Sequence, residues 1–152
     1  MISTEEQKRL DEELMRECRG YSERDNKPDG AYIKHGSIFF NMNKIKRLIE
    51  AGADVNTKDE YGNSLLDFSV ETDSDELTIL LISAGADVNS KNNGGRSPLH
   101  WAVFWNTVDI AEYLISAGAN VNAKDDLGRS PLYYGVVSEE MQELLEQHGA
   151  TE

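Results

Sequence analysis

Side chains that could bind a metal ion or act as nucleophiles are few and scattered in this sequence. The three histidines, His35, His100 and His148, do not share the spacing of metal ligands, and the single Cys18 cannot complete a zinc site. A lone cysteine also forms no internal disulfide and gives no sign of an oxidising compartment. These residues therefore predict neither a metal centre nor a cofactor site.

Two further groups have the composition of a known site without its pattern. Asp73, Asp75 and Glu76 lie close together, but the glycine and the downstream glutamate of a calcium-binding loop are missing. Gly94-Gly95 is followed by neither a Walker lysine nor a G-x-x-G pattern, so it predicts a turn and not a phosphate-binding loop. We interpret the acidic cluster as solvated surface and expect no enzymatic activity.

The dominant pattern is a repeat of 33 residues. The phrase A-G-A-D/N-V-N occurs at 51–56, 84–89 and 117–122, and the same step separates Ser64, Ser97 and Ser130. A fixed period in this range is typical of stacked supersecondary units.

Residues 92–122 are the best-formed unit. A turn rich in asparagine and glycine precedes Ser97-Pro98, which are suited to the cap and the first position of a helix. Apolar residues at helical spacing predict one short helix after Ser97 and a second between Asn106-Thr107 and Gly118. Their apolar faces consist of Leu99, Ala102 and Val103, and of Ile110, Tyr113, Leu114 and Ile115.

The segment S-P-L-H-W-A at 97–102, the 33-residue step and A-G-A-N-V-N at 117–122 together resemble the ankyrin repeat. The resemblance covers roughly residues 25–150. It implies an all-α solenoid of helix-turn-helix units joined by β-turn or hairpin loops, in a single domain over 1–152. The expected parts are an N-terminal capping helix and loop (1–24), a degenerate first repeat (25–57), a second (58–90), a third (91–123) and a shortened C-terminal capping repeat (124–152).

The N-terminal segment 3–19 is predicted to be a helix. Ser3 and Glu6 have the spacing of a capping box, and Leu10, Leu14 and Cys18 form one apolar stripe. A single stripe with charge elsewhere suits a lid on the first repeat, and residues 20–30 are expected to form a loop.

The first and last repeats depart from the pattern. The first has Ala31-Tyr32-Ile33-Lys34 in place of S-P-L-H, and its register follows from a small residue that recurs at Gly36, Ser69, Ala102 and Gly135. The fourth is two residues short near Ser138. Glu146 replaces Ile82 and Ile115 there, so we expect this repeat to cap the stack.

Composition excludes several classes of function. The formal net charge is −13, from 28 acidic and 15 basic residues, and 58–89 contains eight acids against Lys58 alone. A chain with this charge is not expected to bind nucleic acid or an anionic membrane through its average field. Neither a signal peptide nor an apolar run long enough for a membrane span is visible, so we expect a cytoplasmic protein.

The resemblance implies that turn tips and the ends of the first helices line a concave, partner-binding face. It also implies that His100 bonds turn backbone and a neighbouring hydroxyl. The candidate contact residues are Glu60, Tyr61, Asn63, Glu71, Thr72, Asp73, Asn93, Arg96, Phe104, Trp105, Asp126, Leu127, Arg129 and Val137. Trp105 is either a partner contact or folded back over the shortened fourth repeat, and we interpret Phe68 and Trp101 as core.

These features favour a non-enzymatic module that binds a protein partner, with a basic partner suited to its charge. The chain is expected to be monomeric when free. Small ankyrin proteins resemble adaptors or inhibitors, and some bacterial ones are immunity proteins against secreted toxins. The alternatives are a general signalling adaptor and a homo-oligomeric scaffold.

Overall fold

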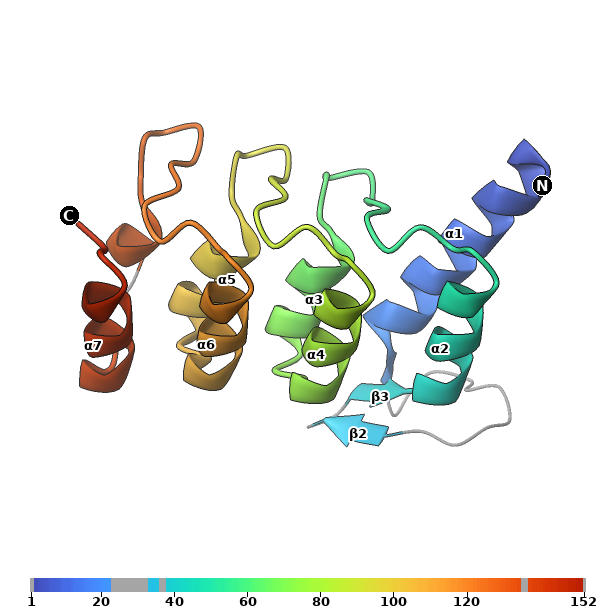
Figure 1. Ribbon diagram of the computed structural model, residues 1–152, viewed down its shortest axis with the longest axis horizontal. Coiled ribbons are helices and arrows are strands. Elements are labelled where there is room, and N and C mark those ends of the chain that lie inside the picture. Colours follow the sequence, from blue (N-terminus) through green and yellow to red (C-terminus); the bar gives the residue numbers. More distant parts are fainter. Residues whose placement is uncertain (1, 23–32, 36–37, 135–136, 152) are drawn as a thin grey trace.

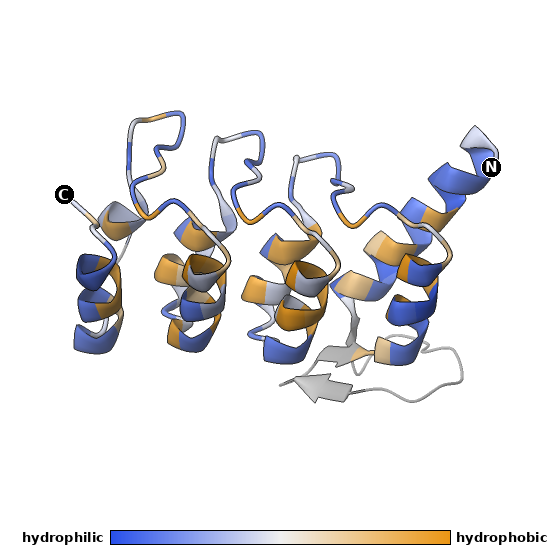
Figure 2. Cartoon of the chain, viewed as in Figure 1, coloured by the Kyte–Doolittle hydropathy of each residue, from blue (hydrophilic) through white to orange (hydrophobic). Residues whose placement is uncertain are grey.

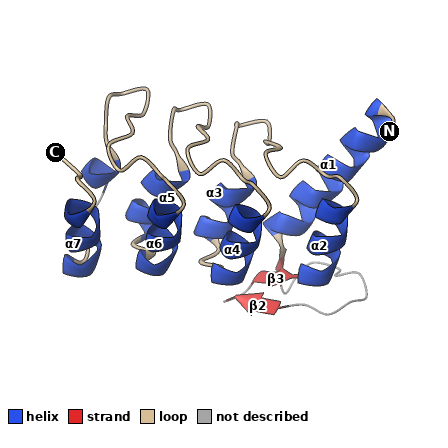
Figure 3. Cartoon of the chain, in the orientation of Figure 1, coloured by secondary structure: helices blue, strands red, loops and turns tan. Residues whose placement is uncertain are grey.

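A row of helix pairs, joined by three loops that project in one direction, makes up most of the molecule (Figures 1 and 3). The computed structural model describes residues 2–22, 33–35, 38–134 and 137–151. Its helices are α1 (Thr4–Arg19), α2 (Met42–Glu50), α3 (Leu65–Glu71), α4 (Asp75–Ser83), α5 (Pro98–Trp105), α6 (Val108–Ser116), the 3₁₀ helix η1 (Pro131–Tyr134) and α7 (Glu139–Gln147). The helical solenoid predicted from the sequence is confirmed.

The helices form two layers. In the inner layer, α1, α3, α5 and η1 pack each against the next, and in the outer layer α4, α6 and α7 do the same. The layers are joined through the pairs α1–α2, α3–α4 and α5–α6. Apolar residues concentrate where the helices meet, and polar residues dominate the projecting loops (Figure 2).

Capping residues place the inner helices. Ser64 and Ser97 are the N-caps of α3 and α5, and each forms a capping box with the residue three positions later, Asp67 and His100. These contacts satisfy backbone amides that a helix start leaves without partners. Gly118 follows the C-cap of α6 with a φ of +99°, a conformation that favours glycine.

The core is a continuous seam between the two layers. Leu65, Leu77, Leu99, Ile110, Leu114, Met141 and Leu145 are all fully buried in it. Ser69 and Ala102 are also fully buried, which agrees with the recurring small residue, whereas Gly36 and Gly135 lie outside the described residues.

The N-terminal helix is where the sequence placed it. Ser3 accepts a hydrogen bond from the Glu6 amide at 3.1 Å, and Leu14 and Cys18 are fully buried. The helix packs against both α2 and α3, so it takes the place of an inner helix in the first unit and is more than a lid. Lys44 of α2 bridges Glu13 and Glu17 at 2.8 Å each and fixes the pair.

The first repeat differs from the helix pair expected in 25–57. The described residues contain a three-stranded antiparallel sheet of order β1-β3-β2, formed by β1 (Tyr21–Ser22), β2 (Ile33–His35) and β3 (Ile38–Phe40). The loop predicted for 20–30 therefore begins with a strand, and 23–32 lie outside the described residues. Because α1 already fills the inner position, the chain needs no second inner helix before α2.

The opening of the fourth repeat differs from those of the second and third. Among the described residues its opening is the 3₁₀ helix η1, whereas α3 and α5, the inner helices of the second and third repeats, are α-helical. The Ser138 amide donates to Asn106 Oδ1 at 3.0 Å, and Ser138 then caps α7. Glu146 is exposed on the last helix, which agrees with its expected place at the end of the stack.

Candidate partner-binding surface

His100 is held at both ring nitrogens. Its Nδ1 lies 3.0 Å from the Ser97 amide nitrogen and 2.9 Å from the Ser97 hydroxyl, and its Nε2 lies 3.1 Å from the Arg129 carbonyl oxygen. Burial lowers the pKa of His100, although the Arg129 carbonyl and Asp125 act in the opposite direction. A fully buried, neutral imidazole with two partners ties the third unit to the fourth, and the predicted structural role is confirmed.

Successive loops are joined by a regular series of hydrogen bonds. The Asn93 amide donates to the Tyr61 carbonyl at 3.0 Å, and the Asp126 amide donates to the Gly94 carbonyl at 3.1 Å. Gly62 allows this approach, because a Cβ at its φ of +75° would lie 2.8 Å from the Asn93 amide nitrogen.

Lysine side chains at the bases of the loops also connect each loop to the next. Lys58 donates to the Lys91 carbonyl at 2.8 Å, and Lys91 donates to the Lys124 carbonyl at 2.7 Å. Units of one geometry and one period thus follow each other along the chain. A family model described as ankyrin repeats in three copies matches residues 35–125 and 75–151.

The chain belongs to the ankyrin repeat family. Ankyrin repeats are protein–protein interaction modules, so the fold supports an interaction function. A comparison with curated proteins found no match.

We use the term concave face for the surface formed by α3, α5, η1 and the loops 51–64, 84–97 and 117–130. Large side chains stand out from it into solvent. Tyr61 and Leu127, at two loop tips, are 64% and 74% exposed, and Tyr133 of η1 is 69% exposed. A face with this much exposed aromatic and aliphatic area is a candidate interface.

Trp105 faces the second repeat. It is 53% exposed, and together with Asn63 and Glu71 it lines a pocket of about 230 Å³. Phe104 is 48% exposed and packs edge-to-face against the Trp105 ring at 4.9 Å between centroids. The alternative in which Trp105 covers the fourth repeat is not the arrangement in the structure.

Arginines stack on the inner-layer aromatic rings. The Arg96 guanidinium lies 5.1 Å from the Trp101 ring centroid and 5.2 Å from that of Tyr134, and Arg129 lies 4.8 Å from Tyr134. Arg129 also pairs with Asp125 at 2.9 Å, and Tyr134 donates a hydrogen bond to the same carboxylate. Two predicted contact residues, Arg96 and Arg129, thus hold the aromatic surface in place.

The other candidates do not form a single cluster. Thr72 caps α3 through its hydroxyl, which donates to the Phe68 carbonyl at 2.8 Å, and Asp73 is exposed beside it. Val137 is half-buried at the C-terminal end of the stack. Three further candidates, Glu60, Asn93 and Asp126, are exposed on successive loops.

Sequence reasoning missed the role of Phe68 and Trp101. Both are only partly buried, and both line the pocket beside Trp105. Their equivalent in the fourth repeat is Tyr134, so one aromatic recurs every 33 residues. An arginine lies five residues before both Trp101 and Tyr134. This recurring arginine–aromatic spacing is the sequence signal for an aromatic ring that is covered by a guanidinium group at the surface.

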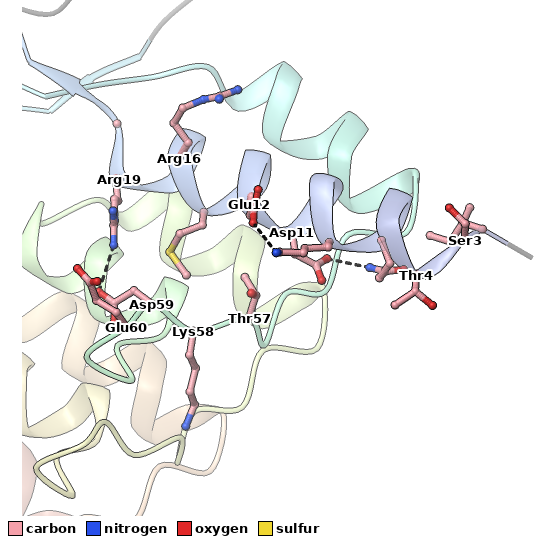
Figure 4. A pocket seen from close by; sticks show the side chains of 15 residues that line it. Ser3, Thr4, Asp11, Glu12, Arg16, Arg19, Thr57, Lys58, Asp59 and Glu60 are labelled. Carbon is pink, nitrogen blue, oxygen red and sulfur yellow. Dashed lines mark hydrogen bonds and ion pairs between the residues drawn. The ribbon is translucent and has the colours of Figure 1, made fainter.

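A second groove of about 1250 Å³ lies between α1 and residues 57–60 (Figure 4). Arg19 crosses it to Asp59 at 3.2 Å, and its guanidinium also lies 5.1 Å from the Phe68 ring centroid. Asp11 accepts hydrogen bonds from Gln7 at 2.8 Å and from the Asp54 amide at 2.7 Å. The polar groups of this groove therefore attach α1 to the loop 51–64.

The described residues contain no group of three or more histidine, cysteine or acidic side chains placed to hold a metal ion. Burial raises the pKa of the Cys18 thiol, which keeps it protonated and weakly nucleophilic. In the same part of the chain, every helix is too short or too polar to cross a bilayer.

Proposed function

We propose that this chain is a non-catalytic binding protein that holds a basic protein partner against its concave face. The exposed aromatic side chains on that face carry the proposal. Tyr61 and Trp105 both lie on it and are each more than half exposed. Aromatic side chains bury a large area with few rotatable bonds, which is why they dominate the energy of protein interfaces.

The distribution of charge supports a basic partner. Residues 1–58 contain 11 basic and 11 acidic residues, whereas 59–152 contain 4 and 17, so the whole excess of 13 negative charges belongs to the second to fourth repeats. A field of one sign over the binding region accelerates encounter with a partner of the opposite sign.

The proposed role is inhibition in the cytoplasm, as an immunity protein inhibits a toxin. A basic enzyme that acts on nucleic acid, such as a nuclease toxin, would present cationic side chains that an acidic repeat surface can cover. A homo-oligomeric scaffold would instead show an apparent mass that rises with concentration, and sizing over a range of concentrations separates the two.

The test is affinity capture from the native source with three matched baits. The parent chain and Ile79→Ala are expected to retain the same basic protein, because Ile79 is exposed on the outer helix α4. Trp105→Ala is expected to lose it. A partner that is retained by Trp105→Ala and lost by Ile79→Ala would place the interface on the outer layer and refute the proposal.

A further inference from the structure

A repeated arginine fills the space between the inner helices of the third and fourth repeats. Arg96 lies within about 5 Å of the ring centroids of both Trp101 and Tyr134. Its Nε also donates a hydrogen bond to the Tyr134 hydroxyl at 3.0 Å. One guanidinium thus contacts an aromatic ring of its own repeat and the equivalent ring of the next.

The second repeat has asparagine where this arginine is expected. Asn63 precedes Arg96 by 33 residues, and Phe68 precedes Trp101 by the same step. An asparagine side chain is too short to extend across both rings. The result is the pocket of about 230 Å³, which is lined by Asn63, Asp67, Phe68, Glu71, Trp101 and Trp105.

The walls of this pocket combine aromatic rings with two acidic side chains, Asp67 and Glu71. Asp67 is only 6% exposed, and its Oδ2 accepts hydrogen bonds from the Ser64 amide at 2.7 Å and the Ser64 hydroxyl at 3.1 Å. Its Oδ1 is buried and has no hydrogen-bond partner among the described residues. Within the same part of the chain, neither Asp67 nor Glu71 forms an ion pair.

A buried acceptor without a donor costs free energy until a donor reaches it. At the equivalent place in the third repeat, His100 uses both ring nitrogens. Asp67 lines the pocket at the position that His100 occupies in the next repeat, and its buried Oδ1 has no such partner among the described residues. Two acidic side chains and three aromatic rings around one small cavity are suited to a cation, which would favour the ionised form of both acids.

We propose that the pocket between α3 and α5 binds the guanidinium group of one arginine side chain from the partner. This inference rests on the proposed function, which supplies a basic protein as the partner. A planar guanidinium stacks on aromatic rings and pairs with carboxylates through several N–H groups, whereas an ammonium is a strongly hydrated point charge. The chain itself places guanidinium groups on the equivalent rings of the next repeats.

The direct test uses N-acetyl-arginine methylamide as a probe and needs no partner. Trp101 and Trp105 are the only two tryptophans, so their indole N–H signals in ¹⁵N-labelled protein report on the pocket. The probe is expected to shift both signals saturably. The lysine analogue should bind at least about fivefold more weakly, and the neutral, isosteric citrulline analogue should not saturate. Equal shifts from the arginine and citrulline probes would overturn the proposal.

Asn63→Arg tests whether the chain's own guanidinium can fill the pocket. Asp59 stands where Asp125 pairs with Arg129, so the new side chain has a carboxylate to bind. We expect this variant to lose the probe response and to melt at the same or a higher temperature than the parent. Ser116→Arg adds the same charge at the exposed end of the outer helix α6 and should bind the probe like the parent. An unchanged probe response in folded Asn63→Arg would refute the assignment.

Two further measurements complete the test. If Asn63→Arg does not fold, Glu71→Gln is the deciding variant. Glu71 is an exposed acid, so its replacement by glutamine should weaken probe binding roughly threefold to fivefold. An affinity equal to that of the parent would contradict the pocket. In the capture experiment, a basic partner that Asn63→Arg retains and Trp105→Ala loses would overturn the pocket but leave the proposed function intact. Loss of the partner from both variants, with Ser116→Arg still retaining it, supports both.

Discussion

Replacing Asp67 with asparagine is expected to remove a pH dependence from the stability of the second repeat. Burial raises the pKa of Asp67 to about 7, although the hydrogen bonds from Ser64 and the charge of Lys58 act to lower it. Asp59 adds to the upward shift. The other charged groups near the carboxyl are Glu71, which shares its pocket, and Arg96, which stacks on the Trp101 ring in the same wall.

The sign follows from the direction of the shift. The ordinary aspartate value is 3.8, so the folded state binds the proton more tightly than the unfolded chain. The contribution of Asp67 to stability is therefore complete below the unfolded pKa and is lost as the pH rises through the folded value. Linkage between the two values gives a loss of about 2–3 kcal/mol from pH 5 to pH 8.

The measurement is the free energy of unfolding in urea, followed by far-UV circular dichroism at several pH values from 5 to 8. Other groups titrate with the opposite sign, since ion pairing with Lys44 lowers the pKa of Glu13. The informative quantity is therefore the difference between Asp67→Asn and the parent. We expect the variant to gain about 2–3 kcal/mol relative to the parent over this range, because asparagine does not ionise.

Asp73→Asn is the matched control. It removes the same charge from an exposed position whose φ of +51° suits asparagine, so its difference from the parent should stay nearly constant with pH. Parallel stability curves for Asp67→Asn and the parent would mean that the carboxylate is already ionised at pH 5. The account of its burial would then be wrong.

Four other changes separate the functions of individual side chains. His100→Ala should lower the free energy of unfolding by roughly 1–3 kcal/mol, because buried hydrogen bonds are lost. Its partner affinity should be unchanged once the folded fraction is corrected for. A large loss of affinity in a variant that melts at the same temperature as the parent would place this residue in the interface. Glu146→Ile should promote self-association seen by sedimentation, because it exposes an apolar end to the stack, and a variant that stays as monomeric as the parent at high concentration would contradict the cap. In binding kinetics, Glu71→Lys should slow association with a penalty that shrinks as salt is added, whereas Trp105→Ala should speed dissociation, at a cost of about 2 kcal/mol nearly independent of salt. Parent-like kinetics for Trp105→Ala would exclude the concave face.

The repeat period made most of the fold predictable. From Ser64 onward, turn residues, caps and apolar spacing coincide in every unit, and each expected outer helix is present. The first unit was less predictable because its inner helix, α1, lies before an insertion and shares no repeat motif. The apolar stripe through Leu14 and Cys18 predicted the helix, but only the tertiary packing shows that it occupies an inner position.

The candidate site was predictable in its exposed parts only. Tyr61, Leu127 and Trp105 stand out because large side chains occupy positions that are usually polar in the repeat. Phe68 and Trp101 have the spacing of core residues, and a one-dimensional pattern does not distinguish a ring buried by other apolar groups from one covered by arginine. That distinction depends on Arg19 and Arg96, which come from a different helix and from the preceding loop.

The arginines on and beside the concave face do not conflict with a basic partner, because acids outnumber basic residues in this part of the chain. Arg19 pairs with Asp59, Arg129 pairs with Asp125, and Arg96 is stacked between two rings. Lys91 and Lys124, the other cations after residue 58, lie at the loop bases, where Lys91 is bound to a backbone carbonyl. The four cations after residue 58 stand against 17 acids, so a partner within a Debye length of about 8 Å still meets a negative field. The arginines instead hold the aromatic rings in fixed positions, so that less conformational entropy is lost when a partner binds them.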